Sequence, residues 1–335
     1  MRRLRNALIG ACLLSFVVWL GAFNATKPRI LVLHSTSQDS AWAQQMDRGM
    51  RQALQVNRRP ISVDWLYLDA GSPMSARETE ETRAEARRSI DRIDPDVLIA
   101  VDDEANALVA QDFLGRERRI LYVSLDRSPS DYGYTDAPNA SGIAEQLPWP
   151  AIRDAVIDLL PDRSPRLTVI GVDNPTGRAE LAQVQSFDWG PVRIGDASLV
   201  STAQQWRDFV LHDGNSDILL VLSTQNLPDA AGVVTAAEIA GWTQSNARSL
   251  PIGTQVDFVT DGGALSFSPS PDDYGEEAIR LALNWLDGRT SPGPPPPTVS
   301  PHFEVAIRQS LLAQRGLALS PIYLEAAREN GTLLD

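Results

Sequence analysis

The segment Asp96-Val97-Leu98-Ile99-Ala100-Val101 decides the fold class of this 335-residue chain. One acid is followed by five apolar residues, a run that fits a strand buried on both faces of a parallel sheet. Arg29-Ile30-Leu31-Val32-Leu33 is a second run of the same kind. A helical pattern follows each of them, so the two segments predict β-α-β units with parallel strands.

The same alternation extends outward from these two strands. Further strands are predicted at 61–68, 120–123, 167–172, 192–199, 218–222, 251–253 and 263–267. Helices are predicted at 42–56, 76–92, 104–113, 150–160, 177–185, 202–211, 236–246 and 274–286. A Gly-, Asn- and Pro-rich segment at 130–141 separates two such series. We therefore predict an α/β fold of two doubly wound parallel-sheet lobes.

The N-terminus has the pattern of an export signal. Arg2, Arg3 and Arg5 precede a mainly apolar run at 7–23. Positive residues before an apolar stretch are retained on the inner side while the stretch enters the bilayer. The pattern predicts an N-terminal apolar helix at 1–27, either a cleaved signal peptide or a retained inner-membrane anchor. Cys12, the chain's single cysteine, is expected to be buried within this leader.

Composition excludes several classes of function. The formal net charge of −13 leaves no basic stripe for phosphates, so we expect no nucleic-acid partner. No cysteine follows the leader and the chain has three histidines, so we predict no metal site and no cofactor. A Gly-x-Ser-x-Gly nucleophile elbow is missing, and 171–177 lacks the spacing of a P-loop or a dinucleotide site. We predict that the protein is not an enzyme.

The chain resembles the ABC transporter substrate-binding proteins, a periplasmic-binding-protein-like family with the type I fold. The residues that carry the resemblance occur in matching order from Ile30 to the C-terminus: Ile30-Leu31-Val32-Leu33-His34-Ser35 with Trp42, Pro95 to Asp103, Gly142-Ile143 with Glu145, Gly263-Ala264-Leu265-Ser266, Asp273-Tyr274-Gly275, and Leu286-Asp287-Gly288. The resemblance implies two lobes joined by three crossing segments. We expect these crossings near Gly142–Glu145, Leu265–Ser268 and Pro292–Thr298.

The resemblance also implies that each lobe is interrupted in sequence. We expect an N-terminal lobe from 28–143 plus 268–291, and a C-terminal lobe from 144–267 plus 297–335. In open parallel sheets a ligand lies beyond the carboxyl ends of the strands. Two lobes whose strand ends face each other would therefore form a closable ligand site.

Candidate ligand-binding residues in the first lobe follow the strand ends. Ser35, Thr36 and Ser37 leave the first strand and enter a helix, where hydroxyls and free N–H groups suit a carboxylate or phosphate. The alternative is that Ser37 or Asp39 caps the helix and that His34 is a satisfied buried side chain. Trp42 is expected either to stack on a ligand or to pack in the core.

Acidic residues end two further strands of this lobe. Asp102 and Asp103 follow the 96–101 strand and Asp126 follows the 120–123 strand. A ligand ammonium group would suit them, and the alternative is interaction with the dipole of the following helix. In the second lobe the corresponding positions are Asn174, Thr224, Gln225 and Asp257.

These observations predict an extracytoplasmic solute-binding protein of an ABC-type importer, periplasmic and with N-terminal membrane association. Its expected partners are a small organic solute and the permease subunits. The family resemblance suggests that the solute is amino-acid-like. The alternative is a membrane-tethered ligand sensor that signals to a partner kinase or cyclase. In both cases ligand binding shifts an equilibrium between open and closed states.

Overall fold

The computed structural model describes residues 9, 12–16, 18–19, 21, 26–70, 74–125, 127–288, 298 and 302–335. Most of the predicted leader lies outside these residues, and so does the predicted crossing near Pro292–Thr298 except for Thr298 itself. In the described part, no helix combines the length and the apolar character needed to cross a bilayer. The chain forms two compact units. Unit 1 consists of Met1–Ser124, Pro129–Ile143 and Gly275–Pro297, and unit 2 of Leu125–Ser128, Ala144–Tyr274 and Thr298–Asp335.

Unit 1 is built on a five-stranded sheet with the strand order β2-β1-β3-β4-β5. Its strands are β1 (Arg29–His34), β2 (Ser62–Tyr67), β3 (Val97–Val101), β4 (Arg119–Leu125) and β5 (Ala140–Ala144). The helices are α2 (Ala41–Val56), α3 (Ala76–Ile93), α4 (Asp102–Leu108) and α10 (Pro271–Leu286), with short 3-10 turns η1 (Ala110–Phe113) and η2 (Pro129–Tyr132). Strands β2, β1, β3 and β4 are parallel, as expected for strands joined by helical crossovers.

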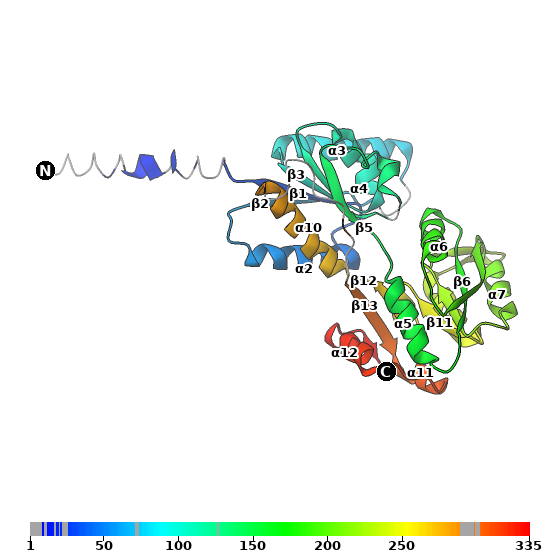
Figure 1. Ribbon diagram of the computed structural model, residues 1–335. Helices are drawn as coiled ribbons and strands as arrows, with labels where there is room; N and C mark the ends of the chain where they lie inside the picture. The colour runs from blue at the N-terminus through cyan, green and yellow to red at the C-terminus, as the bar shows by residue number, and fades with distance from the viewer. Residues whose placement is uncertain are drawn as a thin grey trace. The chain divides into compact units, whose positions relative to one another are not determined.

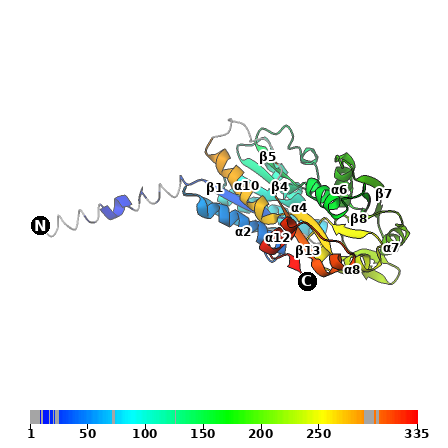
Figure 2. The ribbon, with the colours of Figure 1, turned by 60° about the horizontal axis from the view of Figure 1, so that its bottom comes forward.

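Helices cover both faces of the unit 1 sheet, with α2 and α10 on one face and α3 and α4 on the other (Figure 1). Strand β3 is buried throughout, which explains why its sequence is continuously apolar. Helices α2 and α10 lie side by side in both views (Figure 2). A Cβ at Gly275 of α10 would lie 2.1 Å from the carbonyl oxygen of Met46 in α2, so only glycine allows this close approach of the two helices.

Unit 2 contains a seven-stranded sheet with the order β14-β13-β12-β11-β8-β6-β7. Its strands are β6 (Arg166–Val172), β7 (Arg193–Val200), β8 (Ile218–Val221), β11 (Leu250–Gly253), β12 (Leu265–Pro269), β13 (Phe303–Arg308) and β14 (Leu333–Leu334). The helices are α5 (Trp149–Leu159), α6 (Pro175–Ser186), α7 (Ala203–His212), α8 (Ala236–Asn246), α9 (Asp257–Thr260), α11 (Gln309–Gln314) and α12 (Pro321–Glu329). The strands are parallel from β7 to β12, and β13 runs antiparallel to β12.

Two apolar clusters bury the two faces of the unit 2 sheet. One holds residues of α5, α6, α11 and α12, including Trp149, together with Trp189 from the loop after α6. The other holds residues of α7, α8 and α9, including Trp206 and Phe258. A sheet covered on both faces is the doubly wound arrangement that the alternating sequence predicts.

The structure contains elements that the sequence-based expectations lack: β5, the hairpin of β9 (Leu227–Asp229) and β10 (Gly232–Val234), α9, and the C-terminal β13, α11, α12 and β14. Strand β5 lies at the end of the Gly/Asn/Pro-rich segment. It was not predicted because the turn-forming residues of that segment do not show a strand pattern. The hairpin of β9 and β10 was not predicted, because its strands are three residues long and carry Pro228. The predicted helix at 104–113 is divided into α4 and η1, with Val109 between them in a non-helical conformation.

Candidate ligand site

Each of the two sheets has a topological switch point, the place where the order of the strands reverses. In unit 1 the chain order reverses between β1 and β3, and in unit 2 it reverses between β6 and β8. Crossovers leave in opposite directions at such a point, so the strand ends on either side border a crevice suited to a ligand. Most of the predicted site residues follow these four strands.

Ser35 and Thr36 follow β1 at the unit 1 switch point, and they differ in what their hydroxyls do. The Ser35 hydroxyl donates to the Val101 carbonyl at 2.8 Å and accepts from the Ala105 N–H at 2.8 Å. It therefore fixes the end of β1 to the end of β3 and the start of α4. The Thr36 hydroxyl oxygen is buried and has no hydrogen-bond partner among the described residues. A buried hydroxyl of this kind is costly unless a ligand or water completes it.

Trp42 and Asp102 are brought together from opposite sides of the switch point. The indole N–H of Trp42 in α2 donates to the Asp102 carboxylate at 3.1 Å. Trp42 is half-buried, so it is neither a core residue nor fully in solvent. The pair therefore combines an aromatic face with a carboxylate, which suits a ligand that has an apolar part and a positive group.

Three of the four described non-glycine residues with positive φ lie at the carboxyl ends of strands of unit 1, and the fourth, Asp94, is the C-cap of α3. Asp69 after β2, Asp102 after β3 and Ser124 near the end of β4 have φ values of 53°, 63° and 57°. Non-glycine residues seldom adopt this left-handed region, and such strain tends to cluster at functional sites. The observation favours this edge of the sheet as the functional edge.

The other predicted residues of unit 1 are only partly located. Ser37 is half-buried in the loop before α2, and its carbonyl accepts from the N–H of Ser40. Neither Ser37 nor Asp39 caps α2, because Ser40 is the N-cap residue and makes no side-chain cap. Asp103 is half-buried in the first turn of α4. Asp126 lies outside the described residues.

His34 is buried, as the alternative interpretation expected, but only its Nε2 is hydrogen-bonded; its Nδ1 has no partner among the described residues. Its Nε2 lies 2.9 Å from Asp47, and the Tyr67 hydroxyl donates to the same carboxylate at 2.5 Å. Burial raises the pKa of Asp47, but the hydrogen bonds from His34 and Tyr67 and the charge of Arg51 outweigh it, so the pKa lies below its usual value. Burial and the neighbouring Asp47 charge raise the pKa of Tyr67. This network holds α2 against β1 and β2.

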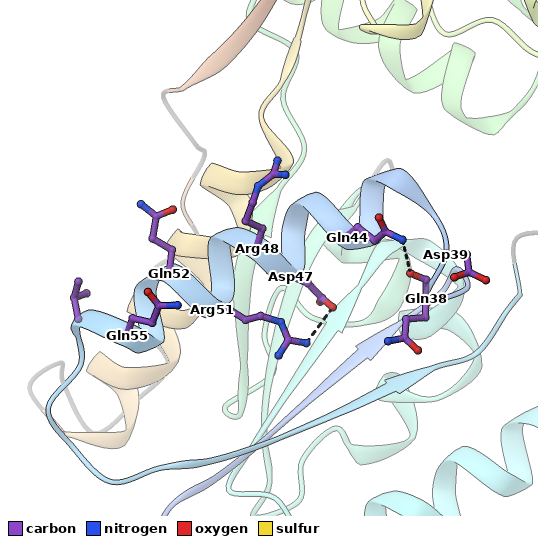
Figure 3. Close-up of a pocket in the computed structure, with 9 residues that line it drawn as sticks. Gln38, Asp39, Gln44, Asp47, Arg48, Arg51, Gln52 and Gln55 are labelled. Carbon is purple, nitrogen blue, oxygen red and sulfur yellow. Dashed lines mark hydrogen bonds and ion pairs between the residues drawn. The ribbon is translucent and has the colours of Figure 1, made fainter. Parts of the chain in front are cut away.

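A groove of about 980 Å³ runs along the outer side of α2 (Figure 3). Its lining is polar except for one valine: Gln38, Asp39, Gln44, Asp47, Arg48, Arg51, Gln52, Gln55 and Val56. Arg51 lies 3.6 Å from Asp47 and stacks over the Trp65 ring at 4.3 Å. None of the predicted ligand residues lines this groove, so it is separate from the switch point.

The predicted residues of unit 2 lie at its own switch point or beside it. Asn174 follows β6 and caps α6, accepting from the Gly177 N–H at 2.7 Å. Thr224 and Gln225 are in the loop after β8, half-buried and exposed respectively. Asp257 is the exposed first residue of α9, and its charge adds to burial in raising the pKa of Asp261.

Glu180 is a buried residue of this site that the sequence analysis missed. It lies in α6 with 5% of its surface exposed. Its carboxylate accepts from the Ser223 N–H at 2.9 Å and from the Ser223 hydroxyl, whose oxygen accepts from the Gln255 amide at 3.3 Å. The signal was available, because Gly177, Glu180 and Val184 form the buried face of α6 and an acid on such a face needs a polar partner.

Thr254 is a second missed residue, directly after β11. It is 1% exposed, and its hydroxyl has no hydrogen-bond partner among the described residues. The residue after a strand at the same edge as Ser223 and Gln255 is well placed to complete a polar wall. Across the described ranges, no group of three or more His, Cys, Asp or Glu side chains is arranged to hold a metal ion.

Comparison with known proteins identifies the fold. No family model matches the sequence, and no curated protein matches it either. Among solved structures, an ABC domain from Streptococcus pneumonia in complex with L-Trp is 13% identical with a TM-score of 0.60, covering 92% of this chain and 100% of that one. A substrate-binding protein with adhesive properties from Clostridium difficile is 13% identical with a TM-score of 0.61, covering 88% and 96%.

A leucine binding protein from Thermotoga maritima has the same fold, at 12% identity and a TM-score of 0.52, with 78% of this chain and 83% of that one covered. These neighbours are binding proteins of the periplasmic type I class. The chain therefore has the type I periplasmic binding protein fold, which confirms the predicted fold class of its two sheets. The resemblance noted in the sequence is confirmed at the level of the fold.

Proposed function

We propose that this protein is the extracytoplasmic solute-binding component of an ABC-type importer. It binds a small organic solute, and the bound state is the one that the membrane permease recognises. Each of its two units has a doubly wound sheet with polar side chains at the switch point, and this repetition is the observation that carries the proposal. The type I fold of binding proteins supports it.

The proposed mechanism is a ligand-dependent shift between two states. The solute contacts strand-end residues of both units only when the protein has closed, so its binding free energy favours the closed state. Thr36, Trp42 and Asp102 provide the unit 1 contacts, and Thr254 provides that of unit 2. These are binding contacts, and the proposal includes no catalytic step.

The chemistry of the unit 1 residues supports an amino-acid-like solute. Asp102 and Asp103 attract an ammonium group, the Trp42 indole covers an apolar part, and the Thr36 hydroxyl donates to an oxygen. Two of the structural neighbours are described as bound to L-Trp and as leucine-binding. The proposed location is the periplasm or the outer surface of the cell, where an importer collects its solutes.

Mass spectrometry of protein purified without refolding tests this proposal. We expect a small organic molecule to be released on denaturation, and the same molecule to raise the melting temperature when it is added back. Two variants locate the site by fluorescence: Trp42→Phe at the proposed site and Trp242→Phe, an equally half-buried tryptophan of α8.

The solute-induced change in emission should be reduced in Trp42→Phe and retained in Trp242→Phe. The proposal is wrong if neither the released material nor a panel of amino acids, amines and sugars changes the melting temperature. It is also wrong if the purified protein converts the bound molecule into a product.

A further inference from the structure

A group of basic residues lies where the chain enters unit 1. Lys27, the only lysine of the chain, precedes β1, and Arg58 and Arg59 precede β2. The two strands pair in parallel with Arg29 opposite Ser62, and the Ser62 N–H donates to the Pro28 carbonyl at 2.9 Å. The segment before β1 and the segment before β2 are therefore neighbours at the amino edge of the sheet.

Helix α2 adds an apolar residue to the same edge. It ends at Val56, which is 79% exposed and is followed directly by the loop of Arg58 and Arg59. We call Lys27, Val56, Arg58 and Arg59 the basic patch. An exposed valine beside basic residues is the combination that binds the interface of an anionic bilayer, where the apolar group inserts and the charges meet headgroups.

The charges of the basic patch are only partly neutralised within the protein. Arg59 is paired with Asp287, whereas Arg58 is exposed and has no ion-pair partner among the residues described. The nearby acids Asp94 and Asp96 are bound by Arg118 at 3.1 Å and by the Arg29 N–H at 2.8 Å. The basic patch is positively charged, whereas the chain as a whole has a formal net charge of −13.

The sequence before the basic patch identifies its partner. The apolar run at 7–23 is followed by only three residues, 24–26, before Lys27. Three extended residues reach at most about 10 Å. When the run is in the bilayer, Lys27 is therefore within roughly one Debye length of the headgroups. The rest of the acidic protein is repelled by the same surface, which leaves the patch as the side that approaches it.

We propose that the basic patch of Lys27, Val56, Arg58 and Arg59 docks on the anionic surface of a phospholipid bilayer. The contact holds unit 1 by its amino edge, at the opposite end of the strands from the switch point. It depends on the leader entering a bilayer and is independent of the proposed solute. Each unpaired basic residue is expected to raise the affinity of the basic patch for the anionic surface roughly fivefold.

Site-specific labelling of the full chain tests this docking. Cys12 is the only cysteine, so Cys12→Ser gives a background free of thiols. Val56→Cys places a fluorophore in the basic patch, and Val233→Cys places it on the β9–β10 hairpin of unit 2, where the valine is 66% exposed. The labelled proteins are reconstituted in vesicles of phosphatidylcholine with 30% phosphatidylglycerol, about the anionic content needed for a negative surface, or of phosphatidylcholine alone.

The measurement is quenching of the label by aqueous iodide. We expect the label at 56 to be quenched at least about twofold less on the anionic vesicles than on the neutral ones, and the protection to decline as salt is added. The label at 233 should be quenched equally on both. Arg58→Glu should abolish the protection at 56, whereas Arg193→Glu, an exposed arginine of unit 2, should leave it unchanged.

Two results would overturn the proposal. One is equal quenching at 56 on anionic and neutral vesicles. The other is protection that persists in Arg58→Glu, since an uncharged contact or a protein partner would then account for it. Circular dichroism of each variant establishes that the fold is retained, and Arg58 is exposed enough for its reversal to leave the core intact.

Discussion

The switch points of the two sheets have the same topology and different chemistry. At the unit 1 switch point Thr36 has an uncommitted hydroxyl, and three residues at the strand ends have strained backbones. At the unit 2 switch point Asn174 is committed to a helix cap and Ser223 to the buried Glu180. The hydroxyl of unit 2 that has no partner among the described residues at this edge, that of Thr254, lies one strand away, after β11. The comparison shows that topology fixes where a ligand site lies, while local hydrogen bonds decide which side chains remain available to a ligand.

The largest expected effect is at the buried acid of unit 2. Glu180→Ala removes the acceptor for both the N–H and the hydroxyl of Ser223, leaving two polar groups without their partner. We expect a loss of about 3 kcal/mol in the free energy of unfolding. Urea denaturation of the full chain measures it. Glu325→Ala, at an acid of α12 that is 61% exposed, is the control and should change the value by less than about 0.5 kcal/mol.

The next effect is at the corresponding buried acid of unit 1. Asp47→Asn weakens the hydrogen bonds with His34 and Tyr67 and should cost about 2 kcal/mol at neutral pH. Because the pKa of Asp47 is lowered from 3.8 in the folded state, its stabilisation is present above that pH and is lost as the pH falls through the folded value. The difference between wild type and variant should therefore narrow in acid.

Unfolding curves from pH 7 to pH 3 measure this dependence, in the range set by the ordinary carboxyl pKa. Asp154→Asn replaces an aspartate that is 57% exposed, and it is the control that should change the free energy of unfolding by less than about 0.5 kcal/mol. A constant difference for Asp47→Asn down to the lowest pH would mean that the network does not stabilise the ionised carboxylate.

A smaller effect is expected at the helix cap of unit 2. Asn174→Ala removes the acceptor of the Gly177 N–H and should cost about 1 kcal/mol in unfolding free energy. Asn174→Asp restores an acceptor and should recover most of the loss. If Asn174→Ala instead weakens solute binding without changing stability, Asn174 contacts the ligand and the cap is secondary.

The smallest effect on stability is expected at Thr36. Thr36→Val removes a buried hydroxyl that has no partner among the described residues, so the free energy of unfolding should change by less than about 0.5 kcal/mol. Affinity for the solute identified by mass spectrometry should decline about fivefold or more, as measured by calorimetry. Unchanged affinity would remove Thr36 from the proposed site and would reverse the contrast between the two switch points.

The fold was predictable because its signals are local and repeated. Buried strands such as β3 are continuously apolar, and α3 begins with a complete capping box between Ser75 and Glu78. The hairpin β9–β10 was not predictable in this way, since a pair of three-residue strands has no periodicity to detect. The antiparallel direction of β13 also leaves no mark in its own sequence.

The site was predictable only in position. Strand ends identify Ser35, Trp42 and Asp102, but the sequence does not show that the Ser35 hydroxyl is committed to β3 and α4 or that Trp42 binds Asp102. Glu180 was missed because it lies within a helix, away from any strand end. Which partner a polar side chain finds depends on tertiary contacts between distant segments, and a single sequence does not contain those contacts explicitly.

The last thirty or so residues of the chain complete unit 2, since β13 and β14 form one side of its sheet and Val305, Ile307, Leu312 and Ala327 belong to one of its clusters. Unit 2 therefore does not have a complete core until this segment has paired with β12. Loss of the segment by proteolysis would leave β12 as an unpaired edge of a sheet with a partly exposed apolar cluster, a combination that favours aggregation.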